Sequence, residues 1–252
     1  APVKYQQKKE ILQKFKSSDI ESELSYMACG YCGHIYIKNM PNQEVINQLY
    51  DQYYTYPSPM LKSFSPTRDN TFLDYFEQHV IELCEKNQLN SVFEVGCYDG
   101  YILSQLKKKG FNVSGCDPSN GADIGISFGI DIIKDFFNHK LIKETNGSID
   151  ILISRHFIEH VQNPKSYLLE FSKVIQEKGL IILETPNISY FLERGLPSVF
   201  SLQHISLFTS CSFLMLLQDC GFEPILRFET PDNLILVAKK KCDHKIIPKS
   251  VS

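Results

Sequence analysis

The spacing of hydrophobic residues alternates between two patterns from about residue 90 to residue 220. Apolar runs of strand length occur at "SVFEV", "FNVSGC", "IDILIS" and "GLIILET". Between these runs, apolar residues recur every three or four positions, as on one face of a helix; examples are Ile102, Leu103 and Leu106, then Leu168, Phe171 and Ile175. Alternating strands and helices are typical of a mainly parallel sheet that is covered by helices on both faces.

The pattern differs on either side of this region. Before it, Phe72, Phe76 and Val80 indicate a first helix, for which Asn70 is the candidate N-cap. After it, "FEPILRFET" and "LILVAKK" predict two strands joined by a turn. We therefore predict a doubly wound, Rossmann-like α/β fold with a mainly parallel sheet, an antiparallel final strand pair and a small N-terminal appendage.

The appendage covers residues 1–65, and the α/β domain covers residues 66–252. The appendage is rich in Lys, Gln, Tyr and Pro, and it contains a C-x-x-C pair, Cys29 and Cys32, which is typical of half a zinc site. Tetrahedral zinc needs four ligands, and no second C-x-x-C occurs in the chain. The other candidate donors are His34, Cys242 and His244. Zinc at this pair is therefore not favoured, and we expect reduced thiols.

Composition narrows the class of protein. With 252 residues, 43% of them hydrophobic, the chain can bury a large core. Lys and Arg number 26 against 29 Asp and Glu, without a basic stripe, so nucleic acid is not an expected partner. No apolar run approaches the roughly 20 residues of a membrane span, and the N-terminus does not resemble a signal peptide. We expect a cytoplasmic protein without a membrane partner. Because the chain begins without Met, it can be part of a longer polypeptide with further domains.

The loop after the first strand of the alternating region, "FEVGCYDGYIL", contains glycines at positions 96 and 100. Glycine at the carboxyl end of a strand lets a ligand approach the backbone. Carboxylates at Glu94 and Asp99 would repel a pyrophosphate but suit the sulfonium and ammonium groups of S-adenosylmethionine. About 20 residues later, Asp117 ends the next strand and is placed to accept the hydroxyls of a ribose.

With these motifs, the chain resembles the class I S-adenosylmethionine-dependent methyltransferases over most of residues 70–240. It is most similar to the branch of bacterial sugar C-methyltransferases and related sugar O-methyltransferases. The segments that carry this likeness are "FEVGCYDGYIL", "GCDPS", "GIDIIKDFF", "RHFIEHVQNP", "LETPN" and "QHISLFT". The appendage is similar to the end of that branch's zinc-binding region. One cysteine pair and the long C-terminal domain of the sugar C-methyltransferases are absent from this sequence.

The resemblance implies residues for cofactor binding. Glu94, Gly96 and Gly100 would border the methionine part, Asp117 would bind the ribose, and Asp135 with Phe136 would flank the adenine. We assign four further residues to the same site: Cys97, Tyr98, Pro118 and Arg155. Tyr98 stands where the family more often has Asn.

The acceptor site is predicted from "SRHFIEHVQNP" and "SLQHISLFTS". His156, Glu159 and His160 follow the strand "IDILIS", and His204 lies in a loop before a helix that begins near Ser210. An imidazole is suited to take a proton from a hydroxyl at neutral pH, so these four are the catalytic candidates. Metal binding by His156 and His160, four positions apart, and ordinary polar packing are alternatives, and we assign no metal ligand. The substrate-binding candidates are Tyr53, Tyr54 and Tyr56, as a lid, and Asn187.

These assignments predict an enzyme that transfers a methyl group from S-adenosylmethionine and releases S-adenosylhomocysteine. The expected acceptor is a small molecule, namely a hydroxyl of a nucleotide-activated sugar or of another precursor in carbohydrate or capsular polysaccharide biosynthesis. The alternatives are C-methylation of a nucleotide-linked keto-sugar, a non-catalytic cofactor-binding domain, and a nucleotide-dependent oxidoreductase.

Overall fold

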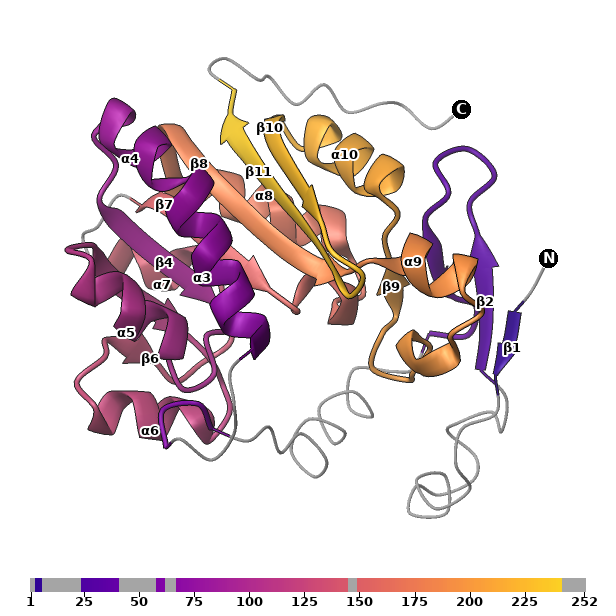
Figure 1. The fold of residues 1–252 in the computed structure, drawn as a ribbon, viewed down its shortest axis with the longest axis horizontal. Coiled ribbons are helices and arrows are strands. Elements are labelled where there is room, and N and C mark those ends of the chain that lie inside the picture. The colour runs from indigo at the N-terminus through magenta and orange to yellow at the C-terminus, as the bar shows by residue number, and fades with distance from the viewer. Residues whose placement is uncertain (1–2, 6–23, 41–57, 62–66, 145–148, 242–252) are drawn as a thin grey trace.

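A computed structural model describes residues 3–5, 24–40, 58–61, 67–144 and 149–241, which contain two β-sheets (Figure 1). The larger sheet has the strand order β10-β11-β8-β7-β4-β5-β6. Its strands are β4 (Ser91–Val95), β5 (Asn112–Cys116), β6 (Ile132–Ile133), β7 (Ile149–Arg155), β8 (Ile175–Pro186), β10 (Phe222–Glu229) and β11 (Asn233–Lys240). Strands β4 to β8 are parallel, whereas β10 and β11 are antiparallel at one edge. This arrangement confirms the predicted fold.

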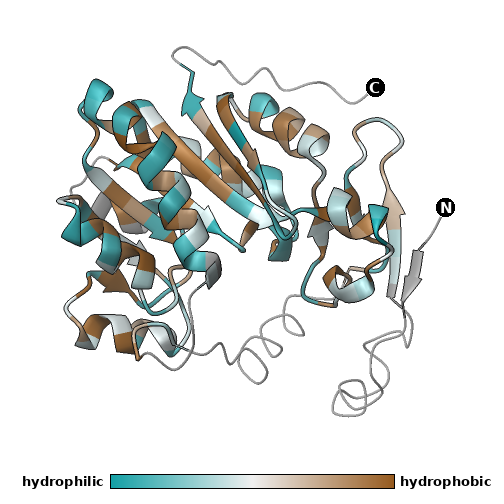
Figure 2. Ribbon diagram, viewed as in Figure 1, coloured by the Kyte–Doolittle hydropathy of each residue, from teal (hydrophilic) through white to brown (hydrophobic). Residues whose placement is uncertain are grey.

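Helices cover both faces of the larger sheet. One buried cluster joins the sheet to α7 (His139–Glu144), α8 (Pro164–Val174) and α10 (Ser210–Asp219). On the other face, a second cluster joins it to α3 (Thr67–His79), α4 (Ile81–Asn87), α5 (Tyr101–Lys108) and α6 (Gly121–Ser127). The central strands are apolar along most of their length, and polar residues lie on the outer sides of the helices (Figure 2). Among the described residues, no helix has the length and apolarity to cross a membrane.

Two helix boundaries differ from the prediction. Asn70 lies inside α3 and does not cap it; its side chain instead accepts a hydrogen bond from the Tyr101 hydroxyl at 3.2 Å. Ile175 is the first residue of β8 and not the end of α8, because the strand begins directly after the helix. The predicted start of α10 at Ser210 is confirmed, with Thr209 and Ser212 forming a capping box.

The smaller sheet combines the appendage with a segment that is distant in sequence. Its order is β1 (Val3–Tyr5), β2 (Leu24–Ala28), β3 (Ile35–Ile37) and β9 (Ser206–Leu207). Strand β9 belongs to the connection between β8 and α10, which also contains α9 (Ile188–Glu193) and the short 3-10 helix η2 (Pro197–Val199). The residues that form the core of this unit come from both parts: Tyr26, Ile35, Ile37, Ile188, Val199, Phe200, Leu202, Ile205 and Leu207. The appendage therefore packs against the connection that carries His204.

Candidate active site

A cleft lies where the loops leave the carboxyl ends of β4, β5 and β7. Its lining residues are Pro59, Asp69, Glu94, Gly96, Cys97, Tyr98, Asp99, Tyr101, Ile102, Asp117, Arg155 and His156. Four of these side chains are acidic, and Arg155 is the one Arg or Lys among them. The cleft is therefore acidic and lies at the edge of the sheet where ligands of such folds bind.

Glu94 is the most deeply placed acid of the cleft, since it belongs to β4 and is 3% exposed. Its Oε2 atom is buried and has no hydrogen-bond partner among the described residues. Burial raises the pKa of Glu94 to about 8; Arg155 opposes this shift, whereas Asp69, Asp117 and Asp99 add to it. An unpaired carboxyl oxygen that faces a cleft can bind a ligand donor, and a positively charged donor would stabilise its ionised form.

The two glycines of the loop have different environments. Both have positive φ angles, +74° at Gly96 and +70° at Gly100, which glycine adopts without strain. A Cβ at Gly100 would lie 3.0 Å from Ile132 and 3.1 Å from Ile130, so this glycine makes room for core packing. Gly96 lines the cleft, whereas Gly100 does not. Any contribution of Gly100 to cofactor binding would therefore come from its backbone.

Tyr98 also has a positive φ, +49°, which is unfavourable for a residue with a side chain. Its N–H donates to Asp117 Oδ2 at 2.9 Å. Its ring packs directly against Gly121: a Cβ atom at that position would lie only 2.4 Å from two ring carbons of Tyr98. His156, at the other side of the cleft, has a φ of +47°. Strained backbone of this kind, costing on the order of 1 kcal/mol per residue, often occurs at functional sites.

Asp99 and Asp117 both already accept hydrogen bonds from protein groups. Asp99 accepts from the Ser58 hydroxyl at 2.6 Å and from the N–H groups of Met60 and Tyr101. It therefore holds residues 58–61 beside the start of α5. Asp117 accepts at Oδ1 from the N–H and the hydroxyl of Ser119.

Arg155 forms a buried ion network at the end of β7. Its Nε donates to Glu184 at 2.6 Å and its Nη1 donates to Asp69 at 2.9 Å, while the guanidinium lies 4.4 Å from the centre of the Phe72 ring. Burial alone would lower the pKa of Arg155, but Glu184, Asp69 and Glu94 outweigh it and raise that pKa. Burial alone would likewise raise the pKa of Glu184, yet Arg155 and His156 lower it to about 2. Arg155 Nη2 has no hydrogen-bond partner among the described residues and can bind a ligand carboxylate.

The remaining predicted binding residues lie at the margin of the cleft or elsewhere. Pro118, Asp135 and Phe136 follow β5 and β6 and are exposed; they are not among the lining residues. Asn187, after β8, is buried and its amide donates to the carbonyl of Thr230 at 3.0 Å. Tyr53, Tyr54 and Tyr56 lie outside the described residues.

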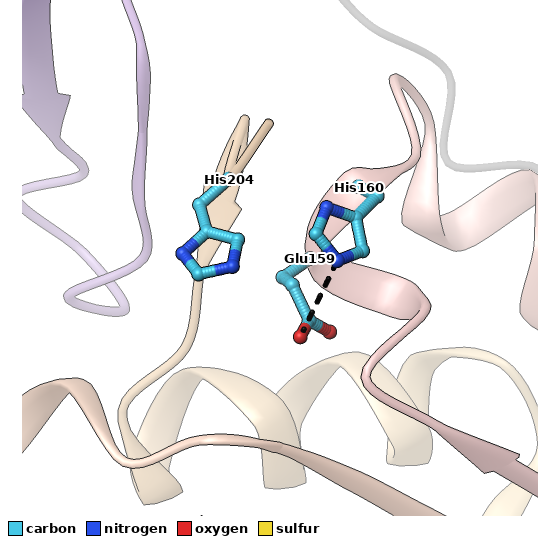
Figure 3. Close-up of side chains that lie close together, drawn as sticks. All are labelled: Glu159, His160 and His204. Carbon is cyan, nitrogen blue, oxygen red and sulfur yellow. Dashed lines mark ion pairs between the residues drawn. The ribbon is translucent and has the colours of Figure 1, made fainter. Parts of the chain in front are cut away.

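The predicted catalytic residues come together beside the cleft. Glu159 and His160 belong to the short 3-10 helix η1 (Ile158–His160), and His204 approaches them from the loop before β9 (Figure 3). The rings of His160 and His204 are 5.0 Å apart, and His160 Nε2 is 3.8 Å from Glu159 Oε1. His156 connects this cluster with the cleft, because it lines the cleft and its Nδ1 lies 3.4 Å from Glu159 Oε1.

Burial controls the charge of this cluster. It lowers the pKa of His160 to about 4, although Glu159 acts in the opposite direction, so the ring is neutral at pH 7. Burial would raise the pKa of Glu159, but the nearby imidazoles of His156, His160 and His204 outweigh this effect and lower that pKa to about 2. The cluster thus contains an ionised carboxylate and a neutral His160. An imidazole with so low a pKa is a weaker proton acceptor at neutral pH than we expected from the sequence, because the sequence does not show how deeply His160 is buried.

The cysteine pair of the appendage forms a tight turn. The Cys29 N–H donates to the carbonyl of His34 at 2.8 Å, and the Gly33 N–H donates to the carbonyl of Cys29. Backbone N–H groups of Cys32 and Tyr31 lower the pKa of Cys29, which favours its thiolate. Both cysteines are free thiols. Among the described residues, no third metal-binding side chain joins them, so zinc at this pair stays an unfavoured prediction.

Several residues of the site were not found from the sequence. Asp69 on α3, Glu184 on β8 and Tyr101 on α5 carry no motif, and Pro59 lies in a segment assigned to the appendage. They reach the site through tertiary packing; Asp69 and Arg155, for example, are 86 positions apart. Of these residues, only Glu184 could have been found from the sequence, because it lies near the carboxyl end of a predicted strand, where site residues are expected.

Comparison with known proteins places the chain in a family. Residues 70–226, more than half of the chain, match the family described as "Methyltransferase domain". The chain therefore belongs to this family, which confirms the predicted class, an S-adenosylmethionine-dependent methyltransferase.

Similar proteins include ubiquinone biosynthesis O-methyltransferases. That of Rickettsia bellii (strain OSU 85-389) is 27% identical over 132 residues, covering 51% of this chain and 53% of that protein. That of Agrobacterium fabrum is 25% identical over 140 residues, covering 50% and 54%. The chain thus spans about half the length of these curated relatives. These relatives do not confirm the predicted sugar branch.

Solved structures support the fold. A SAM-dependent methyltransferase from Archaeoglobus fulgidus superimposes with a TM-score of 0.52 at 14% identity, covering 79% of this chain and all of that one. Magnesium protoporphyrin IX methyltransferase from Synechocystis PCC 6803, solved with bound SAH, gives a TM-score of 0.51 at 14% identity, covering 77% and 92%. At such low identity these similarities establish a shared α/β architecture.

The unpaired polar atoms of the cleft match the charged groups of S-adenosylmethionine. The amino-acid end of this cofactor carries an ammonium and a carboxylate, and beside them is a positively charged sulfonium that supplies an activated methyl group. Glu94 Oε2 and Arg155 Nη2 are buried atoms of complementary charge, each without a hydrogen-bond partner among the described residues. The acidic lining as a whole also favours a cation.

Cofactor binding is expected to release a proton from Glu94. Because its pKa in the free protein is about 8, this carboxyl is mostly protonated at pH 7, and a bound ammonium group favours the ionised form. The affinity for S-adenosylmethionine should therefore rise as the pH increases from about 6 to about 7.5 and fall again at higher pH, where the ammonium group of the ligand loses its own proton. Calorimetry in buffers of different ionisation enthalpy should show release of up to about one proton per ligand at pH 7.

The matched control for this experiment is an exposed glutamate. Glu94→Gln should abolish both the proton release and the rise in affinity with pH. Glu77→Gln, which removes a surface ion pair with Lys109, should preserve both. Equal proton release in the Glu94→Gln variant would contradict the assignment.

Proposed function

We propose that this protein transfers a methyl group from S-adenosylmethionine to a hydroxyl oxygen of a small-molecule acceptor. The observation that carries the proposal is the juxtaposition of two groups of residues at one edge of the sheet. One is the acidic cleft with Glu94, and the other is the cluster of Glu159, His160 and His204, which His156 joins to the cleft. The first suits the cationic donor, and the second suits an acceptor that must lose a proton.

On the donor side, Glu94 accepts from the ammonium group, and Arg155 donates to the carboxylate. Asp117 is the candidate for the ribose hydroxyls. An ionised carboxylate offers about four lone-pair positions, and Asp117 already uses three of them for Tyr98 and Ser119. Binding both hydroxyls therefore requires the Ser119 side chain to rotate away. Phe136 is 55% exposed in the loop after β6 and is available to cover the adenine together with Asp135.

On the acceptor side, the protein must align the oxygen with the methyl group and stabilise the oxygen as it loses its proton. The Glu159 carboxylate and the Nε2 atom of His160 can each accept a hydrogen bond at neutral pH, so they attract a hydroxyl hydrogen. Burial of the cluster strengthens this attraction, because water competes less. His160 and His204 are the candidate proton acceptors, and Glu159 stabilises the charge that develops on them.

Two classes of acceptor have support. The resemblance of "RHFIEHVQNP" and "QHISLFT" to sugar methyltransferases favours a nucleotide-activated sugar. The similarity to ubiquinone biosynthesis O-methyltransferases favours an aromatic ring that carries hydroxyls, as in ubiquinone precursors. Both classes present a hydroxyl to the same cluster, and O-methylation is common to both.

The test is a screen with S-adenosylmethionine and two acceptor panels, one of nucleotide-sugars and one of hydroxylated aromatic compounds. We expect one acceptor class to gain the mass of one methyl group with equimolar formation of S-adenosylhomocysteine. Nuclear magnetic resonance of the product should place the new methyl on oxygen. Methylation on carbon, or failure of the protein to bind S-adenosylmethionine in calorimetry, would overturn the proposal.

A further inference from the structure

We propose that Glu159, His160 and His204 form a binding site for a divalent transition-metal ion, coordinated by two imidazoles and one carboxylate. Among the described residues, these three are the one set whose His, Cys, Asp or Glu ligand atoms all lie within 4.8 Å of one another. Ligands about 2.1 Å from a tetrahedral ion are about 3.4 Å apart. The 3.8 Å between His160 Nε2 and Glu159 Oε1 is already close to that value, so small side-chain rotations would complete the site.

The hydrogen bonds of the two rings determine which nitrogen atoms face the ion. His160 Nδ1 lies 2.8 Å from the carbonyl oxygen of Gln203, and His204 Nδ1 lies 2.6 Å from that of Val199. A carbonyl oxygen only accepts, so each Nδ1 carries the hydrogen, which leaves Nε2 of each ring as the atom that can coordinate an ion. Metal-binding histidines are typically oriented in this way, by a bond from the other ring nitrogen to a carbonyl or carboxylate.

Glu159 provides the negative charge of the site. Its side chain is fully buried, and Oε2 accepts a hydrogen bond from Thr185 at 3.2 Å. Its Oε1 has no hydrogen-bond partner among the described residues, although the His156 ring lies 3.4 Å away. The geometry thus brings a carboxylate oxygen and two imidazole lone pairs together (Figure 3). A divalent cation between them would offset their mutual repulsion.

The ligand types indicate the class of ion. Two imidazoles and one carboxylate suit zinc, iron(II) or cobalt(II), whereas magnesium and calcium prefer oxygen ligands. Three protein ligands leave at least one coordination position open, which is the usual form of a catalytic site. If the proposed function holds, an acceptor oxygen can occupy that position and lose its proton more easily. In the metal-bound protein the two histidines would then act as ligands and not as proton acceptors, because a coordinated Nε2 lone pair cannot also take a proton.

Contacts with the appendage fix the position of the loop that carries His204. The Tyr26 hydroxyl lies 2.7 Å from the carbonyl of Ser201 and 3.0 Å from that of His204, and β3 pairs with β9 directly after this loop. The ligands therefore come from two parts of the molecule, the end of β7 and the smaller sheet. A bound ion would link them and raise the melting temperature.

The test measures metal binding without methyl donor or acceptor, so that its failure is distinct from failure of the proposed function. The full chain carries Cys29→Ser and Cys32→Ser, which removes the thiols as competing ligands. After chelator treatment it is titrated with Co²⁺ and Zn²⁺. We expect one equivalent of each, visible d–d absorption from Co²⁺, a higher melting temperature, and no equivalent binding of Mg²⁺.

Two variants in this background test the ligands separately. His204→Ala and the nearly isosteric Glu159→Gln should each weaken Co²⁺ and Zn²⁺ binding about 100-fold or more, since changes in outer-shell groups alone cost 10–100-fold. His139→Ala, which removes a histidine that pairs with Glu170 away from the cluster, should leave binding unchanged. Far-ultraviolet circular dichroism checks that each variant is folded. The proposal is overturned if the protein takes up neither ion, or if uptake is the same in the parent and in Glu159→Gln.

Discussion

The Arg155→Met variant is expected to lose about 3–5 kcal/mol of unfolding free energy at pH 7.5, measured by urea denaturation of the ligand-free protein. Arg155 lies between two buried carboxylates, Glu184 and Asp69. Met preserves most of the side-chain volume and the contact with Phe72, but it leaves both carboxylates without their cation. The cost therefore comes mainly from uncompensated buried charge, with little from a cavity.

The pH dependence distinguishes this cause from a packing defect. In the parent protein, Arg155 helps to lower the pKa of Glu184 to about 2, so the resulting stability is present above the unfolded pKa of about 4.5 and is lost as the pH falls towards 2. Without Arg155, burial raises the pKa of Glu184, and mild acid neutralises it in the folded state. The deficit of the variant should thus be smaller at pH 5 than at pH 7.5.

The control is an ion pair on the surface. Lys134→Met removes the partner of Asp123, where the two side chains are 38% and 57% exposed, and should cost at most about 1 kcal/mol. An Arg155→Met variant as stable as this control, or a deficit independent of pH, would show that the network does not contribute as proposed.

The local sequence pattern was sufficient to predict the larger sheet and the position of the cleft. The apolar runs that formed β4, β5 and β7 are short and bounded by polar residues, and their carboxyl ends meet because parallel strands share one direction. Glu94, Asp117 and Arg155 each lie at or near such an end, so their convergence followed from the predicted topology. The pattern could not separate the roles of the two glycines, since Gly100 is required by contacts with Ile130 and Ile132 from other parts of the chain.

Contacts between segments that are distant in the chain could not be predicted from the local sequence pattern. The pairing of Ile35 with Leu207 joins residues more than 170 positions apart through two strands of only two and three residues. Nothing local in either strand specifies its partner. This pairing nevertheless places His204 opposite His160, and so it determines the geometry of the cluster. The sequence identified both histidines as candidates, whereas their distance, tautomers and burial depend on the folded chain.

The His160→Asn variant is expected to lower turnover by about 10²- to 10⁴-fold, the usual range for removal of a general acid or base. The Asn amide can reproduce the hydrogen bond that His160 Nδ1 donates to Gln203, while the lone pair of Nε2 is lost. The backbone of η1 and the position of Glu159 should therefore be preserved. Since Glu94, Asp117 and Arg155 are unchanged, the affinity for S-adenosylmethionine should stay within about 2-fold.

The matched comparison is His139→Asn, the same substitution at the His139 side chain that pairs with Glu170 outside the cleft and the cluster. It should preserve both turnover and cofactor affinity. Steady-state kinetics with the acceptor identified in the screen, together with calorimetry of the cofactor, separate the two effects. A His160→Asn enzyme with nearly full turnover would place acceptor activation elsewhere. A parallel loss of cofactor affinity would instead indicate that the change disturbs the cleft through His156, because that ring contacts Glu159 and lines the cofactor cleft.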